Sequence, residues 1–128
     1  MHKTHDPKTT AQPFSRYSNA IEAAPGLRWL HASGQVGADP SGKTVAGFEG
    51  QARQAFANLK ALLADAGMDW PDVVKVTTFI TDRAHLATLR KVRDEAMGGA
   101  ICASTLLVVA GLASPDWLIE VEVVAAKA

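Results

Sequence analysis

The feature that most restricts the fold is a nearly continuous apolar segment, Thr-Leu-Leu-Val-Val-Ala, at residues 105–110. Successive side chains of a strand point to opposite faces, so Leu106 and Val108 lie on one face and Leu107 and Val109 on the other. A strand that is apolar on both faces is expected only where both faces of its sheet are covered. The fold must therefore provide a cover for each side of this strand.

Two amphipathic helices are predicted, and both end at glycine. Apolar residues from Ala52 to Ala66 follow the i, i+3, i+4, i+7 spacing of one helical face, and Gly67 stands where a C-terminal cap is expected. The second helix carries its apolar face from Leu86 to Ala96 and stops at Gly98-Gly99. Two helices can cover only one face of a sheet.

The remaining apolar and β-branched runs predict strands at residues 14–20, 28–33, 73–81, 105–110 and 118–125. The order β-β-α-β-α-β-β defines an α+β domain with two helices on one face of a mixed sheet. We expect another copy of the chain to cover the second face, so that the last strand, Leu118 to Ala125, is buried in an oligomer. Residues 1–12 lack apolar periodicity and are predicted to be a flexible N-terminal arm, with the domain at 13–128.

Length and charge narrow the class of protein. The 128 residues fit one domain, and thirteen Lys and Arg residues balance thirteen Asp and Glu residues. A balanced charge disfavours nucleic-acid binding, and with it a ribonuclease. No stretch approaches the roughly 18 apolar residues of a membrane span, and the first twenty residues lack the apolar core of a signal peptide. We therefore expect a cytoplasmic protein with neither nucleic-acid nor membrane partners.

Residues 37–44 read Gly-Ala-Asp-Pro-Ser-Gly-Lys-Thr and match the P-loop pattern. A P-loop runs directly into a helix whose N-terminus holds the phosphates. Here Val45, Ala46 and Gly47 follow, and the helical pattern begins several residues later. Asp39 would also place negative charge beside the phosphates. A turn between two extended segments explains the glycines and the proline, and this interpretation is favoured over nucleotide binding.

A nucleophilic pair is a second alternative, because Cys102 and Ser104 precede a strand while His31 and His85 lie elsewhere in the chain. No nucleophile elbow surrounds these residues, and a lone cysteine beside apolar residues is usually a small buried hydrophobe. The single cysteine also excludes an internal disulfide. No His, Asp or Glu spacing places two ligands convincingly on one helix face or hairpin, so no metal site is expected.

Glu120 and Glu122 are the more informative pair. Alternation along the strand puts both on one face, opposite Ile119, Val121 and Val123. The simplest interpretation is a solvated outer face. If a neighbouring subunit covers that face, however, the carboxylates lie in an intersubunit cleft. Partial loss of water would there raise the pKa of a carboxyl group and suit it to general acid or base chemistry. The alternation alone does not distinguish Glu120 from Glu122.

Four segments follow one another in the order of a known family. They read Ser33-Gly34-Gln35, Gln51-Ala52-Arg53-Gln54, Val74-Lys75-Val76-Thr77-Thr78-Phe79-Ile80-Thr81-Asp82 and Leu118-Ile119-Glu120-Val121-Glu122. From about Tyr17 to the C-terminus the chain resembles the RidA (YjgF/YER057c) family of enamine/imine deaminases. The resemblance implies a chorismate-mutase-like fold and a homotrimer with a small-molecule cleft at each subunit interface. It also implies hydrolysis of reactive enamines or imines to keto acids and ammonia. No cofactor is expected, because the iminium carbon is electrophilic enough for water polarised by a carboxylate.

The resemblance also suggests roles for individual residues. Glu120 matches the position of the family carboxylate that holds the attacking water. Tyr17, Ser33 and Gly34 match residues that line the cleft. Thr105 falls in the segment whose backbone contacts the carboxylate of the ligand.

One departure from the family pattern affects the expected substrate. Deaminase members carry Pro-Ala-Arg-Ser, whose arginine binds the substrate carboxylate with two hydrogen bonds, whereas this chain reads Cys-Ala-Ser-Thr at 102–105. Ser104 takes the place of that arginine, and a hydroxyl cannot reproduce a charged two-pronged clamp. Arg90 on the second helix is a candidate source of charge, and Glu122 and Cys102 are further site candidates. Two hypotheses follow: hydrolysis of a small imine, enamine or related compound, or non-catalytic binding of a small metabolite in the same cleft.

Overall fold

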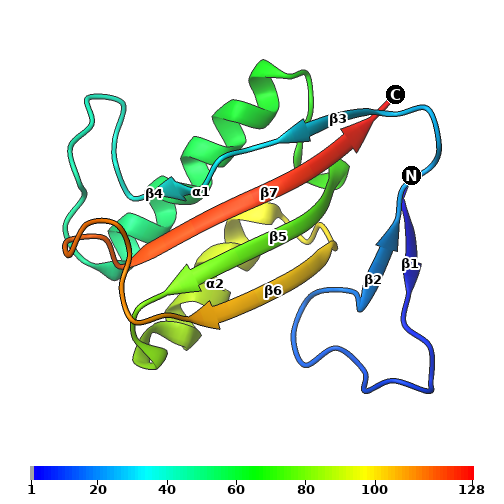
Figure 1. Ribbon diagram of the computed structural model, residues 1–128, viewed down its shortest axis with the longest axis horizontal. Coiled ribbons are helices and arrows are strands. Elements are labelled where there is room, and N and C mark those ends of the chain that lie inside the picture. Colours follow the sequence, from blue (N-terminus) through cyan, green and yellow to red (C-terminus); the bar gives the residue numbers. More distant parts are fainter. Residues whose placement is uncertain (1) are drawn as a thin grey trace.

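The computed structural model describes residues 2–128 and contains a mixed sheet of five strands (Figure 1). The strands lie in the order β3-β7-β5-β6, and β4 pairs with the same edge of β7 as β3. Only β5 and β6 are parallel, since α2 connects them. The strands span Arg28–His31 (β3), Gln35–Val36 (β4), Val73–Ile80 (β5), Ala103–Val108 (β6) and Ile119–Lys127 (β7).

Two helices, α1 (Phe48–Asp65) and α2 (Leu86–Met97), lie behind the sheet on the same face (Figure 1). Short 3-10 turns, Trp70–Asp72 and Arg83–His85, lead into β5 and α2. The core fills the space between the layers with fully buried side chains, among them Phe56, Leu59, Leu63, Val76, Ile80, Leu89, Val121 and Val123. This architecture confirms the predicted α+β class with two helices on one face.

Both helices end at the predicted glycines. Gly67 follows α1 with φ 70°, and Gly98 follows α2 with φ 59°, a left-handed conformation that glycine adopts without a steric penalty. The first helix starts earlier than its apolar pattern suggested, at Phe48, because Phe48 and Gln51 are also buried and extend the stripe by one turn.

The N-terminal part forms a separate hairpin, in which β1 (Lys3–His5) pairs with β2 (Ala20–Glu22). The strand predicted at residues 14–20 was therefore placed too early. Residues 6–19 form a loop instead, because the Asp6 carboxylate accepts hydrogen bonds from the Asn19 N–H at 2.6 Å and the Ser18 hydroxyl at 2.7 Å. Residue 1 lies outside the described residues. Residues 1–12 include β1, and the flexibility expected of this segment stays a prediction.

The sheet face away from the helices is uncovered in the single chain, and we call it the open face. Strand pairing assigns to it Trp29, His31, Lys75, Thr77, Phe79, Ala103, Thr105, Leu107, Glu120, Glu122 and Val124. Trp29 is 51% exposed and Leu107 45% exposed, which is unusual for large apolar side chains in a sheet. Within residues 2–128, no helix has the length and apolar character needed to cross a membrane.

Candidate functional site

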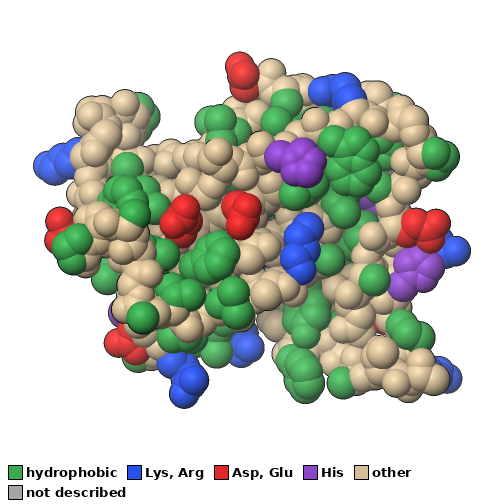
Figure 2. All heavy atoms as spheres, in the orientation of Figure 1, with side chains coloured by type: hydrophobic (Ala, Val, Ile, Leu, Met, Phe, Trp, Pro, Cys, Tyr) green, Lys and Arg blue, Asp and Glu red, His purple; other side chains and the backbone are tan. Residues whose placement is uncertain are grey.

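Both glutamates of β7 project from the open face, as the alternation predicted. Figure 2 looks onto this face and shows acidic side chains near its centre, beside a group of hydrophobic ones. Ile119 and Val121, which flank Glu120 in the chain, are fully buried under the helices. Among residues 2–128, neither Glu120 nor Glu122 has a hydrogen-bond or ion-pair partner, so both carboxylates remain available to a ligand or to water.

Gly34 distinguishes the two glutamates. It lies between β3 and β4, where the chain passes directly over the Glu120 side chain. A Cβ atom at Gly34 would overlap the carboxylate and lie 2.7 Å from its Cδ. Glycine is therefore required for Glu120 to occupy this position, and the exposed Ser33 lies next to it. Of the predicted residues, the structure thus brings Ser33, Gly34 and Glu120 together.

Gln51 of α1 fixes the start of β7. Its buried side chain accepts a hydrogen bond from the Leu118 N–H at 2.9 Å and donates one to the Asp116 carbonyl at 3.0 Å. Both backbone groups would otherwise lack a partner in this corner. The amide therefore ties α1 to the residues just before β7, the strand that carries Glu120.

Thr105 also lies on the open face, two strands away from β7. Its hydroxyl accepts a hydrogen bond from the Lys75 ammonium at 2.7 Å. Lys75 lies in the segment that resembles the family, but it is not among the predicted site residues. The alternation of β5 contained the signal, since it places Lys75 opposite the buried Val76.

Tyr17 and Ser104 belong to a different part of the molecule. Ser18 anchors the loop that carries Tyr17, because its N–H donates to the Cys102 carbonyl at 3.0 Å and it bridges to Ala103 of β6. Tyr17 and Ser104 then line a cavity of about 240 Å³ on the helix side of β6. Arg90 of α2 lines the same cavity, as does Arg93, which the sequence reasoning missed.

One chain does not bring these two groups together. Ser104 pairs with Val76, whose side chain is buried beneath the helices, whereas Glu120 pairs with Phe79 on the open face. In addition, β5 lies between β6 and β7, which separates those strands by about 10 Å. The predicted site residues therefore form two half-sites on opposite faces of the sheet.

Cys102 does not have the properties of a nucleophile. Its side chain is buried, and this burial raises the pKa of the thiol to about 11, so the thiol stays protonated at neutral pH. His85 lies at the start of α2 with its ring stacked on Phe48 at 4.2 Å, and His31 lies on the exposed edge strand β3. The structure thus favours the interpretation of Cys102 as a small buried hydrophobe.

The P-loop-like segment forms the turn that its composition predicted. The Asp39 carboxylate accepts hydrogen bonds from the backbone N–H groups of Ser41 and Lys43 and from the Ser41 hydroxyl. The first glycine of the motif, Gly37, has a packing role, because a Cβ there would lie 2.5 Å from the Gln51 Cα. The Asp39 carboxylate occupies the centre of the loop, where a phosphate would have to bind.

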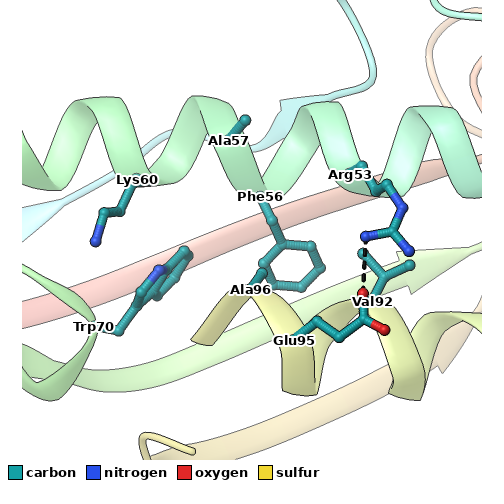
Figure 3. A pocket seen from close by; sticks show the side chains of 8 residues that line it. All are labelled: Arg53, Phe56, Ala57, Lys60, Trp70, Val92, Glu95 and Ala96. Carbon is teal, nitrogen blue, oxygen red and sulfur yellow. Dashed lines mark hydrogen bonds and ion pairs between the residues drawn. The ribbon is translucent and has the colours of Figure 1, made fainter. Parts of the chain in front are cut away.

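A hollow of about 330 Å³ opens between α1 and α2, over Phe56 and Trp70 (Figure 3). Two of the charged side chains that line it, Arg53 and Glu95, neutralise each other, since they form an ion pair at 2.9 Å across the hollow. It contains none of the predicted site residues. We therefore place the candidate site at the two half-sites.

The comparisons with known proteins agree with this fold and show the family. The family model for endoribonuclease L-PSP matches residues 8–127. A RutC family protein of Pyrococcus horikoshii is 36% identical over 91% of this chain and 90% of its own. The mouse 2-iminobutanoate/2-iminopropanoate deaminase is 34% identical over 93% of this chain and 88% of its own. The chain belongs to the RidA/YjgF family, which this family model describes.

Solved structures support the same assignment. A Rid family protein of Yersinia pestis, described as of unknown function, superimposes with a TM-score of 0.89 at 32% identity, over 98% of each chain. This agreement confirms the chorismate-mutase-like fold that the family resemblance implied.

Proposed function

We propose that copies of this chain associate into a homotrimer and hydrolyse a small imine or enamine in a cleft between subunits. The observation that carries the proposal is the position of Glu120. It is an unpaired carboxylate on the open face, held against Gly34, in a family with a relative named as an imine deaminase. The half-site around Tyr17 and Ser104 is incomplete without such a carboxylate. The open face of a second subunit, placed against the β6 edge of the first, would supply it.

The proposed chemistry is general base catalysis by Glu120. The carboxylate accepts a proton from a water molecule as the water oxygen forms a bond to the imine carbon. The resulting carbinolamine then takes a proton on nitrogen, the carbon–nitrogen bond breaks, and ammonia and a carbonyl compound leave. Burial of the cleft on association would remove water from the carboxylate and strengthen it as a base.

The test is ammonia release from 2-iminobutanoate generated in place by an amino-acid oxidase. We expect Glu120→Gln to lower the rate by about 100-fold or more, the usual contribution of a general base. Glu122→Gln is the matched control, because it removes a carboxylate from the same face of the same strand and should change the rate little. Equal rates for wild type and Glu120→Gln would contradict the mechanism.

A second function, non-catalytic binding of a small metabolite in the same cleft, is favoured by one observation. Ser104 stands where the family resemblance implies an arginine, and its hydroxyl cannot bind a carboxylate with two charged hydrogen bonds. Saturable binding of 2-oxobutanoate without any ammonia release from the imine would support this function over hydrolysis.

A further inference from the structure

The cavity behind β6 is positively charged. Three elements enclose it: the loop that carries Tyr17, the strand that carries Ser104 and one face of α2. Leu86, Leu89, Arg90 and Arg93 follow the i, i+3, i+4, i+7 spacing, so one helical face supplies both an apolar wall and two guanidinium groups. No carboxylate lines the cavity. A ligand with a negative charge is therefore favoured over a neutral or cationic one.

The two arginines are not equivalent. Arg93 is 9% exposed and already engaged, because its guanidinium donates to the Asp94 carboxylate and to the Ser15 hydroxyl, both at 3.0 Å. Arg90 lies exposed at the cavity wall, and within residues 2–128 it has no hydrogen-bond or ion-pair partner. Arg90 is thus the cation that can bind a ligand without first losing another partner.

The rest of the cavity fits a small organic acid. The Tyr17 hydroxyl accepts a hydrogen bond from the Phe14 N–H at 3.2 Å, so its own proton is free to be donated. Ser104 adds a second hydroxyl, and Leu89 and Leu106 supply apolar surface. A volume of about 240 Å³ limits the ligand to a few carbon atoms.

We propose that Arg90 determines specificity by binding the carboxylate of a small organic acid with an apolar body, from the helix side of this cavity. In this arrangement recognition of the anion moves from the strand, where Ser104 stands, to α2. Any hydrolysis of such a ligand depends on the function proposed above, whereas binding of its carboxylate by Arg90 does not.

The experiment is calorimetric titration of the full chain with 2-oxobutanoate and with its uncharged amide, 2-oxobutanamide. Loss of a charged hydrogen-bonding partner should raise the Kd of the acid about ten- to hundredfold in Arg90→Gln. The Kd of the amide should stay as in the wild type, and Arg90→Lys should recover part of the affinity for the acid. Arg83→Gln is the matched control, because Arg83 is an exposed arginine just before α2 that does not line the cavity.

Two outcomes would overturn the inference: equal affinity of wild type and Arg90→Gln for the acid, or no binding of the acid by the wild type. A different measurement, ammonia release, shows whether the proposed function itself fails. Ammonia release that survives Glu120→Gln contradicts the hydrolytic mechanism, yet leaves the effect of Arg90 on binding of the acid intact.

Discussion

Gly34 and Glu120 show how one residue position can matter for chemistry more than for stability. Gly34 has no positive φ, so a side chain is excluded there only by the nearby carboxylate. The obstructing atoms belong to the end of a flexible glutamate, which can rotate away at little cost. The absence of a Cβ at residue 34 therefore preserves the position of the carboxylate and contributes little to the fold.

We predict that Gly34→Ala displaces the Glu120 carboxylate and lowers imine hydrolysis at least tenfold, while the thermal midpoint of unfolding changes by only a few degrees. Ammonia release and a thermal melt measure the two quantities. Gly111→Ala is the control, because a Cβ there meets no other atom within 4 Å. Unchanged hydrolysis in Gly34→Ala would show that the position of Glu120 is unimportant.

At the scale of elements, the N-terminal hairpin places Tyr17 against β6, and two carboxylates hold the hairpin. The backbone N–H of Asn19 and the hydroxyl of Ser18 lower the pKa of Asp6 below its ordinary 3.8. The hydrogen bond from His5, at 2.8 Å, lowers the pKa of Glu22 below its ordinary 4.5. A carboxyl group with a lowered pKa in the folded state stabilises that state above its unfolded pKa. The contribution is lost as the pH falls through the folded-state pKa.

The hairpin should therefore open in acid, once the pH has fallen below the ordinary pKa values of 3.8 for Asp6 and 4.5 for Glu22, and at a higher pH than the core. We expect amide protection factors of β1 and β2 to fall between pH 7 and pH 3 while those of β7 persist, as measured by hydrogen exchange. The double variant Asp6→Asn, Glu22→Gln should have weak hairpin protection already at pH 7 and little further change with pH. A hairpin that loses protection together with β7 would contradict this prediction.

At the scale of the whole molecule, the open face is a sheet surface that no other described element of the single chain covers. Phe79 and Leu107 pair across β5 and β6 on this face, and Leu107 is 45% exposed. Exposed apolar surface on a sheet face marks an interaction site. A second copy whose β6 edge lies against this face would bury the apolar surface and bring its own Tyr17 and Ser104 half-site to Glu120.

We predict that the wild type sediments as a trimer and that Leu107→Glu sediments as a monomer, because the new carboxylate would be buried without a partner. Light scattering or analytical ultracentrifugation measures the mass. Leu62→Glu on α1 is the matched control, since Leu62 is 39% exposed but belongs to the helix layer. A monomeric wild type would contradict both the association and the shared cleft.

The sequence by itself determined the elements whose evidence is local. Helical spacing, two terminal glycines and strand alternation correctly predicted α1, α2, β5 and the common face of Glu120 and Glu122. The sequence did not predict the hairpin of β1 and β2. The loop before β2 is held by the Asp6 carboxylate, and no local pattern encodes the pairing of the two strands. Only the tertiary structure decided that Tyr17, Ser104 and Arg90 share a cavity, on the face opposite Glu120. The reason is physical: strand order and register set which side chains meet, and both depend on contacts between residues far apart in the chain.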